Sequence, residues 1–336
     1  MGYKSQVLTH SPVLFLHDIN TTPTPSEWVN ESGATNAVNA TLQNSPTVLT
    51  TASDLPGDVP AAIRADRANN QGARAANYGA LNNPNTAVTI GLWKRISNSQ
   101  KITDANIGTG TAPTTMALGD NTYQRRFSGA NRSSTQDYGR GTFRGGGNSD
   151  FDTFDDTGIF SEWTLEVYVW DAGTITMYAG TVSGSLQEKT SINANEGTVS
   201  SLADNTVADF TVAFQDNDGT DRRFIDGDFA GPFVIPSALT QAQVEAIYSA
   251  AFSSGEIAFT GQNAFTDVNG NAIQNATVYA AKPGVAEAAV TAQTDANGEV
   301  IFTGLDAQTT YYCWAEKDID SDSTLETSQV QIRTST

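Results

Sequence analysis

The sequence predicts an all-β protein made of antiparallel strands stacked as sandwiches, with one short helix. Three observations lead to this fold class. Short runs of alternating apolar and polar residues recur along the chain and are separated by glycine-, asparagine- and aspartate-rich turns. One of these runs forms a complete predicted hairpin. Only one segment, near residue 245, has the apolar spacing of a helix.

The predicted hairpin lies within residues 157–180 and organises the rest of the chain. Leu165, Val167 and Val169 recur at every second position after Trp163, which is the period of a half-buried strand. The turn residues 171–173 end in glycine, which readily adopts positive φ, and alternation resumes from residue 174. We predict that the apolar face of this hairpin, the 163–169 ridge, is covered by a second sheet.

The other elements of the long N-terminal part follow in order. Strands are predicted at residues 13–17, 88–93, 210–214 and, as a broken pair, 224–235. Residues 20–53 are polar and are interpreted as loop and short irregular pieces, or as a long surface excursion, which places Trp28 in a loop. Residues 97–121 are polar with a few apolar residues and are interpreted as a hairpin and its loops. Residues 61–70 fit a helical turn and a strand equally well.

The helix signal lies at residues 240–251. Thr240 followed by Gln243 forms a capping box, and Leu239 with Val244 occupies the positions of a hydrophobic staple. Val244, Ile247, Tyr248 and Ala251 then make one apolar stripe. The sequence therefore predicts a short helix packed on the β-sheet body.

A change of pattern after residues 253–255 divides the chain into predicted domains at 1–252 and 253–336. Beyond this linker, short strands recur around two similar pentads, 266–270 and 294–298, that both end in Asn-Gly. Such spacing predicts a second, smaller β-sandwich.

Charge and cysteine content exclude several classes of function. The formal net charge of −19 over 336 residues disfavours binding to nucleic acid or to an anionic membrane. Cys313 is the single cysteine, so the chain cannot form an internal disulfide. With two histidines and one cysteine, the chain has few residues for a zinc site or for Ser–His or Cys–His catalysis. No run of apolar residues is long enough to span a membrane. The first 20 residues lack the pattern of a signal peptide, and we expect them to begin the folded domain.

One basic segment stands out against this acidic background. Between residues 123 and 147, arginines alternate with aromatic side chains and a glycine-rich run follows; the candidate ligand-binding residues are Tyr123, Arg125, Arg126, Tyr138, Arg140 and Phe143. Aromatic rings that stack on sugars and arginines that donate to hydroxyls favour glycan recognition. Contact with an acidic neighbouring subunit is a second interpretation, and an exposed loop whose arginines pair with the chain's own acids is a third.

Two acidic loops have oxygen ligands at alternate positions, as calcium loops do: Asp216, Asp218 and Asp221, and Asp318, Asp320 and Asp322. The alternative for both is a β-turn with solvated acids. Glu162 and Glu166 share a strand face, but the chain has no Glu-x-Asp-x-x-Glu run for glycoside cleavage. The prediction is a protein without catalytic residues and without a cofactor other than possible calcium.

Four segments, in the order in which the family has them, resemble laminin-G-like, concanavalin A-like jelly-roll domains. They are SPVLFLHD from residue 11, NPNTAVTIGLWKRI from 83, EWTLEVYVWDAGTITMYAGTVSG from 162 and RRFIDGDFAGPFVIPSALTQAQVEAIY from 222. The sequence departs from the family at Ala179-Gly180, where Asn-Gly is usual. The resemblance covers roughly residues 11–252 and implies a two-sheet jelly roll.

Residues 265–305 resemble carboxypeptidase-regulatory-like or bacterial Ig-like modules, with Ala272 where proline is usual. A jelly roll joined to such a module, with almost no cysteine, is similar to virion proteins of tailed phages. This resemblance implies a non-catalytic structural protein at the particle surface: a capsid decoration, fibre or tail appendage, present in many copies or as a homo-oligomer. Its partners would be other virion proteins and a host-surface glycan. The alternative is an extracellular carbohydrate-binding adhesin module of a bacterial surface protein, and a glucanase-type enzyme is the third hypothesis.

Overall fold

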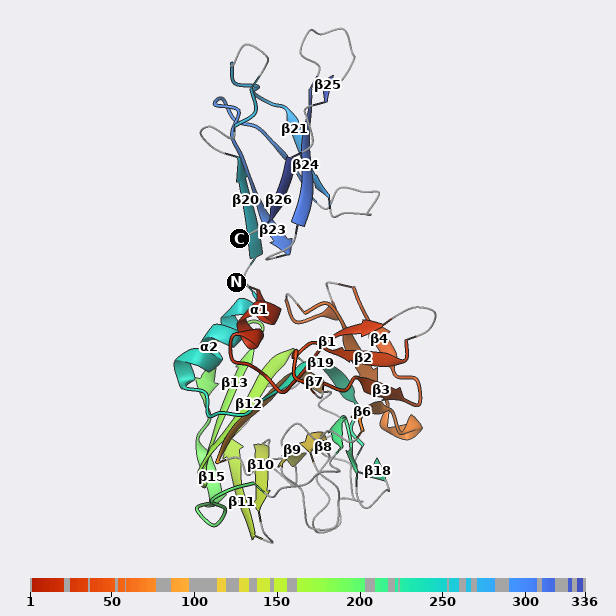
Figure 1. Ribbon diagram of the computed structural model, residues 1–336, viewed down its shortest axis with the longest axis vertical. Coiled ribbons are helices and arrows are strands. Elements are labelled where there is room, and N and C mark those ends of the chain that lie inside the picture. The colour runs from red at the N-terminus through yellow and green to blue at the C-terminus, as the bar shows by residue number, and fades with distance from the viewer. Residues whose placement is uncertain are drawn as a thin grey trace. The chain divides into compact units, whose positions relative to one another are not determined.

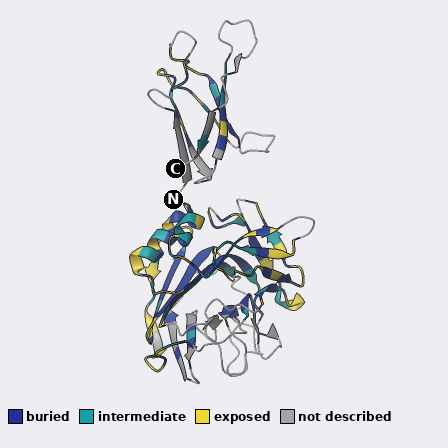
Figure 2. Cartoon of the chain, viewed as in Figure 1, coloured by how far each residue is buried: buried dark blue, intermediate teal, exposed yellow. Residues whose placement is uncertain are grey.

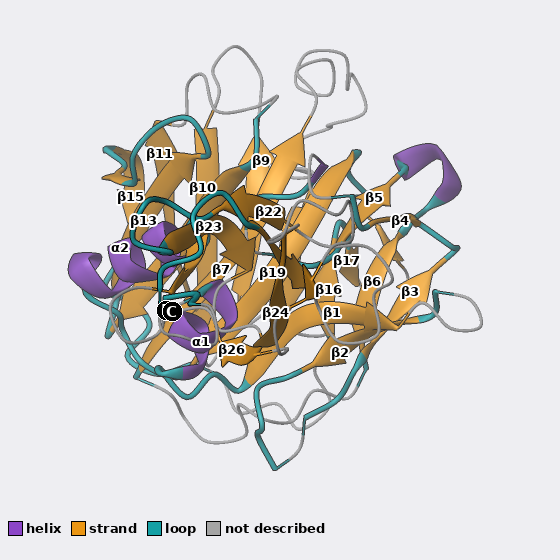
Figure 3. Ribbon diagram, turned by 90° about the horizontal axis from the view of Figure 1, so that it is seen from above, coloured by secondary structure: helices purple, strands orange, loops and turns teal. Residues whose placement is uncertain are grey.

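The computed structural model confirms an all-β protein and divides it into two compact units. One unit is Lys4–Ala251, and the other is Phe252–Thr336 together with Met1–Tyr3. The structure describes residues 2–20, 25–35, 37–51, 54–57, 59–76, 86–96, 114–118, 127–132, 138–145, 148–155, 162–202, 209–216, 221–222, 224–252, 254–259, 264–266, 271–281, 290–306, 310–317, 326–327 and 331–334. Figure 3 shows how strongly strands predominate over helices.

The larger unit is a jelly-roll-like sandwich of two antiparallel sheets (Figure 1). Sheet A contains, in spatial order, β4 (Thr47–Leu49), β5 (Ala62–Ala65), β19 (Gly227–Ile235), β7 (Ala87–Ile96), β12 (Thr164–Asp171), β13 (Thr174–Thr181) and β14 (Gln187–Glu188). Sheet B contains β1 (Leu14–Asn20), β2 (Glu27–Asn30), β3 (Ala40–Gln43), β6 (Gly72–Ala75), β16 (Phe210–Val212), β8 (Thr114–Leu118), β9 (Phe127–Arg132), β10 (Tyr138–Gly145), β11 (Asn148–Asp155) and β15 (Ser191–Asn195).

Strand β1 belongs to both sheets. Its first residues, Leu14 and Phe15, pair with Val234 and Phe233 of β19 in sheet A. From Leu16 onward the same strand pairs with β2 in sheet B. Trp28 lies in β2 with its side chain fully buried, so the predicted loop at this position is wrong. The reason is that the strand is only four residues long and polar on both flanks, which hides its period.

The predicted hairpin forms as β12 and β13. Asp171 pairs with Thr174 across the turn, where Ala172 and Gly173 both have positive φ. Both faces of β12 are buried (Figure 2), because helices cover the face of sheet A that sheet B does not.

The prediction that sheet B covers the 163–169 ridge is wrong. The core between the sheets contains Tyr168 and Trp170, where Phe154 of sheet B lies 6.4 Å from Tyr168 and Phe143 stacks on Trp170 at 5.9 Å between ring centroids. Leu165, Val167 and Val169 therefore lie on the opposite, outer face, because alternate residues of a strand point to opposite sides. The larger aromatic rings occupy the inter-sheet space, and simple hydrophobicity did not distinguish the two faces.

Helix α2 (Gln241–Ala250) packs on the outer face of sheet A. The predicted capping box between Thr240 and Gln243 is present, and Val244, Ile247 and Tyr248 are buried. The Tyr248 ring stacks on Trp93 at 5.9 Å, and its hydroxyl donates to the carbonyls of Thr181 and Gly184 at 2.7 and 2.9 Å. These contacts hold the helix against the sheet.

A shorter helix, α1 (Tyr3–Leu8), was not predicted. Its six residues carry no capping signal, and its packing rests on Tyr3 and Val7, which are four positions apart and fully buried. One 3₁₀ turn, η2 (Arg67–Asn69), follows β5. In the described part of the chain, no helix has the length and apolar character needed to cross a membrane.

The smaller unit contains two further antiparallel sheets. One pairs β20 (Ser254–Phe259) with β23 (Val300–Asp306); the other contains β22 (Val290–Gln293), β21 (Thr277–Ala281), β24 (Thr310–Lys317), β25 (Glu326–Thr327) and β26 (Gln331–Thr334). Their shared core includes Phe259, Phe302 and Cys313. Cys313 is free, and burial raises the pKa of its thiol to about 11. The predicted turn at 294–298 is present, with Gly298 at a φ of +73°.

Glu31 supplies a testable acid-dependent contact beside strand β1. Its carboxylate forms an ion pair with Lys4, whose Nζ lies 2.7 Å away, and lies 3.3 Å from His17 Nδ1. The hydrogen bond from His17 is the main cause that lowers the pKa of Glu31 to about 2 from 4.5, against the opposing effect of burial. Because the folded-state pKa is depressed, this carboxylate stabilises the fold above pH 4.5, and the contribution is lost as the pH falls toward 2.

We expect Glu31→Gln to remove roughly 2 kcal/mol of unfolding free energy at pH 7 and nearly none at pH 2. Urea unfolding at a series of pH values measures both. Glu27→Gln is the control, because Glu27 lies exposed in β2 and accepts from the Asn39 side-chain amide. A loss at pH 7 that persisted unchanged at pH 2 would contradict the assignment.

Candidate functional site

A row of charged side chains crosses one end of sheet A on its outer face. Asp228 of β19 is the register partner of Arg64 of β5 on one side and of Arg95 of β7 on the other. Directly paired residues on neighbouring strands point to the same face. The three side chains therefore meet, and we call this set the Arg64–Asp228–Arg95 row.

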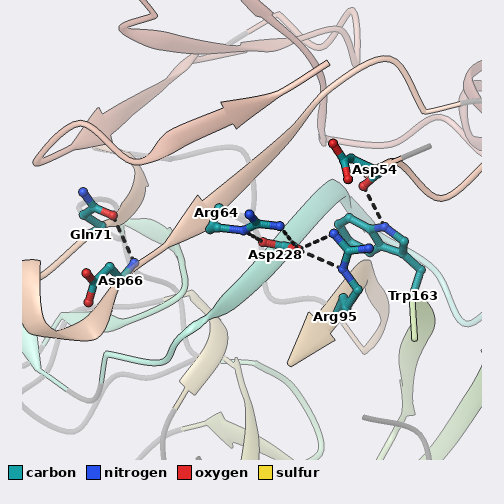
Figure 4. Close-up of polar contacts among 7 residues, drawn as sticks. All are labelled: Asp54, Arg64, Asp66, Gln71, Arg95, Trp163 and Asp228. Carbon is teal, nitrogen blue, oxygen red and sulfur yellow. Dashed lines mark hydrogen bonds and ion pairs between the residues drawn. The ribbon is translucent and has the colours of Figure 1, made fainter. Parts of the chain in front are cut away.

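Asp228 accepts hydrogen bonds from both guanidinium groups (Figure 4). Arg64 Nε and Nη2 donate to the two carboxylate oxygens at 2.7 and 3.1 Å. Arg95 Nε and Nη2 donate to Oδ2 at 2.8 and 2.6 Å. The Asp228 side chain is 7% exposed, Arg95 25% and Arg64 53%. Asp228 is thus a fixed anchor, and Arg64 is its solvent-facing partner.

Trp163 extends the row toward β12. The Arg95 guanidinium carbon lies 5.1 Å from the centroid of the Trp163 ring, within the range of a cation–π contact. The indole Nε1 donates to the backbone carbonyl of Asp54 at 2.9 Å (Figure 4). Arg95 is therefore held on one side by a carboxylate and on another by an aromatic face, which fixes its orientation.

A pocket of about 570 Å³ opens beside this row. It is lined by Arg64, Ala65, Asp66, Arg95, Ile96, Asp226, Gly227 and Asp228. Gly227 sits where β19 begins, and a Cβ there would come within 3.1 Å of the Arg95 carbonyl and 3.2 Å of Ile96. The lack of a side chain at this position keeps the start of the strand close to β7.

The other two pocket carboxylates orient the loop around η2. Asp66 caps η2, accepting from the Ala68 amide at 2.8 Å and from the Asn69 side chain at 2.7 Å. Its own amide donates to the Gln71 side chain at 3.0 Å (Figure 4). Asp226 accepts from the backbone amide of Arg67. Both carboxylates are thereby fixed and have further lone pairs available to a ligand.

The electrostatics of the pocket are nearly balanced. Two guanidinium groups and three carboxylates give the lining a formal charge of −1. The hydrogen bond to Asp228 and the Asp228 charge raise the pKa of Arg64 above its ordinary value, with burial acting in the opposite direction. The pocket therefore offers charged donors and charged acceptors side by side without a strong field of either sign.

The predicted arginine–aromatic segment is only partly described. Tyr123, Arg125 and Arg126 lie outside the described residues. Tyr138 and Arg140 lie in β10, where the backbone alone is described.

Phe143, also in β10, is fully buried and stacks on Trp170 in the inter-sheet core. A ring in this position cannot stack on a sugar, so Phe143 is removed from the predicted ligand-binding set. An aromatic residue among arginines and glycines can mark the core-facing side of a strand as readily as a binding surface.

The predicted calcium loop is described at its two ends. Asp216 and Asp221 are register partners in the hairpin β17 (Gln215–Asp216) and β18 (Asp221–Arg222), which brings their backbones together. Asp218, as well as Asp318, Asp320 and Asp322, lies outside the described residues. Within the described ranges, no group of three or more histidine, cysteine, aspartate or glutamate side chains could hold a metal ion. The calcium sites stay predictions.

Glu166 in β12 and Glu162, which lies just before this strand, do not form a catalytic pair. Glu162 is exposed and contacts the Ser183 hydroxyl. Glu166 is fully buried between the sheets and pairs with Lys94. Glu162 precedes the first residue of β12 and lies at the surface, whereas Glu166 lies inside the sandwich, so the two carboxylates do not converge.

Sequence reasoning missed the Arg64–Asp228–Arg95 row. Arg64 lies in the segment 61–70, whose period did not decide between helix and strand, and Asp228 follows a glycine that broke the strand pattern. The available signal was one charged residue in each of the apolar strands β5 and β19, and two adjacent ones, Lys94 and Arg95, in β7. Only the strand pairing, which joins residues 133 and 164 positions apart, shows that these charges are neighbours.

Comparison with solved structures finds distant likenesses. The chain is similar to the binding domain of botulinum neurotoxin serotype G, with 14% identity, a TM-score of 0.46 and coverage of 96% of this chain and 71% of that one. It is also similar to the serotype D ligand-binding domain in complex with N-acetylneuraminic acid, with 9% identity, a TM-score of 0.46 and coverage of 94% and 72%.

A third likeness is to domain 4 of a GH43 extracellular arabinanase from Geobacillus stearothermophilus in complex with arabinotriose. It has 14% identity, a TM-score of 0.41 and coverage of 70% of this chain and 98% of that one. No protein-family model and no curated protein matches the sequence. Likenesses this distant carry no argument about function, which rests on the residues of this chain alone.

Proposed function

We propose that the protein is a non-catalytic carbohydrate-binding module whose site is the pocket beside the Arg64–Asp228–Arg95 row. The observation that carries this proposal is a preorganised set of N–H donors and carboxylate acceptors around one cavity on the outer face of sheet A. The volume of about 570 Å³ lies within the ~300–1,000 Å³ typical of small-ligand sites.

The chemistry of the lining favours a hydroxyl-rich, neutral ligand. Each sugar hydroxyl donates one hydrogen bond and accepts others, so adjacent hydroxyls can donate to a carboxylate and accept from a guanidinium. Arg64 supplies the exposed donors, and Asp66 and Asp226 supply the acceptors. A strongly anionic ligand is disfavoured because the three carboxylates outnumber the two cations.

The same arrangement supports binding without catalysis. A glycosidase needs one carboxylic acid that delivers a proton and a second carboxylate that acts as base or nucleophile. All three pocket carboxylates are already engaged by guanidinium or amide donors that hold the fold together. Because these hydrogen bonds hold the three carboxylates in place as ions, they favour ligand recognition over acid–base catalysis.

We further propose that the protein is displayed in many copies, or as a homo-oligomer, on the surface of a tailed-phage particle, as a decoration, fibre or tail appendage. The acidic composition and the single buried cysteine support a protein that contacts other virion proteins and avoids nucleic acid. Mass spectrometry of purified particles tests this setting. Detection in a bacterial envelope and absence from particles would instead favour the adhesin alternative.

The binding proposal is tested with a glycan array followed by titration of the bound sugar. We expect Arg64→Met to weaken binding by about tenfold or more, because a charge-assisted hydrogen bond contributes roughly 1.5–3 kcal/mol. Asp226→Asn should also weaken sugar binding, because it removes one of the carboxylate acceptors that line the pocket. The matched control is Arg74→Met, which removes another arginine paired with an aspartate, Asp209 of the larger unit, at 3.1 Å.

Variants of Arg125 and Arg140 belong in the same experiment. Unchanged binding in the Arg64 and Asp226 variants, together with loss in the Arg125 and Arg140 variants, would move the glycan site to the segment that the sequence first suggested. Absence of any bound glycan for the wild-type protein would overturn the proposal.

A further inference from the structure

A lysine and a glutamate lie in direct contact inside the larger sandwich. Lys94 of β7 and Glu166 of β12 form an ion pair, and their side chains are 1% and 0% exposed. The register pairs Lys94 with Thr164 and Leu92 with Glu166, so the two residues are diagonal neighbours on adjacent strands. They lie on the inner face of sheet A, because Leu92 and Tyr168 at the adjoining same-face positions belong to the inter-sheet core.

The surroundings of this pair are mostly apolar. On the strands that flank it, Lys94 is the register partner of Phe229 and Glu166 is the register partner of Ala179. Both partners belong to the inter-sheet core. A side chain here is removed from water, and separate charges in such a place are costly unless hydrogen bonds satisfy the remaining lone pairs.

The Glu166 carboxyl lacks such support. Among the residues that the structure describes, the Lys94 ammonium is the one ionic partner of this carboxyl, and no other hydrogen-bond donor reaches either of its oxygens. The carboxylates of the outer-face pocket differ sharply, since Asp228 accepts four hydrogen bonds from two arginines. A buried ion pair with so few supporting donors is a poor stabilising element, but it is a favourable arrangement for condensation.

We propose that Lys94 and Glu166 become joined by an amide bond that the folded chain forms without another enzyme. Proton transfer from the ammonium to the carboxylate gives a neutral amine and a carboxylic acid, which removes both buried charges. The lone pair of Nζ then attacks Cδ of Glu166 to form the N–C bond. The C–OH bond breaks, and the hydroxyl leaves as water with a proton from Nζ. No oxidant, reductant or activating group is required.

The fold supplies what this reaction needs. Two paired strands hold the amine against the carboxyl, so a bimolecular encounter becomes an intramolecular one, an advantage that reaches effective molarities of about 10⁵ M or more. The dry interior favours expulsion of water and protects the product from hydrolysis. The product has one amide N–H and one carbonyl, which are neutral and easier to bury than two ions.

Intact-mass measurement of the purified full-length chain under denaturing conditions tests the proposal without any variant. We expect a mass about 18 Da below that calculated from the sequence, the mass of one water. The N-terminal peptide must be identified separately so that processing of Met1 enters the calculation. Proteolysis should then release a branched peptide that joins the segments containing Lys94 and Glu166.

Two variants locate the bond. Lys94→Arg and Glu166→Ala should each show the full calculated mass and no branched peptide. Lys4→Arg is the matched control, because Lys4 and Glu31 form a lysine–glutamate pair at 2.7 Å that is open to solvent, and its mass deficit should persist. A wild-type chain with the full calculated mass overturns the proposal, as does a deficit whose branched peptide maps elsewhere.

Discussion

Asp228→Ala will destabilise the larger unit by about 2–3 kcal/mol and abolish the carbohydrate binding that we propose. Removing one member of a buried charged set leaves the remaining charge without compensation, which costs about 3–5 kcal/mol when all members are buried. Here the Asp228 side chain is 7% exposed but Arg64 is 53% exposed, so water recovers part of the loss. Binding fails for a different reason: both guanidinium groups lose the anchor that orients them toward the pocket.

Chemical denaturation gives the stability change, and titration with the sugar found on the array gives the binding change. Asp209→Ala is the matched control, because Asp209 accepts from Arg74 at 3.1 Å and does not line the pocket. We expect about 1 kcal/mol of destabilisation and unchanged binding for that variant. Equal losses of unfolding free energy in the two variants would mean that the pairing of Asp228 with two arginines adds no stability.

Gly91→Val will destabilise the larger unit by about 3 kcal/mol, at the upper end of the usual cost of overpacking. Gly91 lies in the centre of β7, on the outer face of sheet A. A Cβ at this position would come within 2.5 Å of the Phe233 ring and 2.9 Å of a Val167 methyl group. Both neighbours are fully buried in paired strands, so neither can move away without disturbing the sheet.

Thermal and urea unfolding measure this effect, and Gly184→Ala is the control. The Cβ added at Gly184 would meet Thr181 Oγ1 at 2.9 Å, but that hydroxyl lies at the surface beside Ser183 and can rotate. We expect a change below about 1 kcal/mol there. A wild-type midpoint for Gly91→Val would show that the outer face of sheet A is loosely packed.

Local patterns in the sequence predicted the elements well where one hairpin or one cap determines them. The β12–β13 hairpin, its glycine turn and the capping box of α2 depend on residues within a few positions of one another. Helix α1 and strand β2 were missed because they are short and their buried residues, such as Tyr3 and Trp28, have no periodic neighbours.

Patterns could not show which face of β12 meets the second sheet. Leu165 and Val167 are the more conventional core residues, yet Glu166, Tyr168 and Trp170 point inward. The inward face tolerates Glu166 because Lys94 on the neighbouring strand meets it, and that pairing depends on the register between β7 and β12. The same limit applies to Asp228, whose two arginine partners come from strands far away in the chain.

The shared strand β1 has a consequence for how the chain is made. Leu14, near the N-terminus, pairs with Val234 of β19, which is 220 residues later in the chain. Strand β19 also lies between β5 and β7 and pairs with both. During synthesis on the ribosome, sheet A therefore has a vacant central position until almost the whole larger unit has emerged. Contacts this distant in sequence form slowly, and open strand edges attract other chains during the wait. We therefore expect the yield of folded protein to depend on preventing aggregation of the incomplete sheet A until β19 has been synthesised.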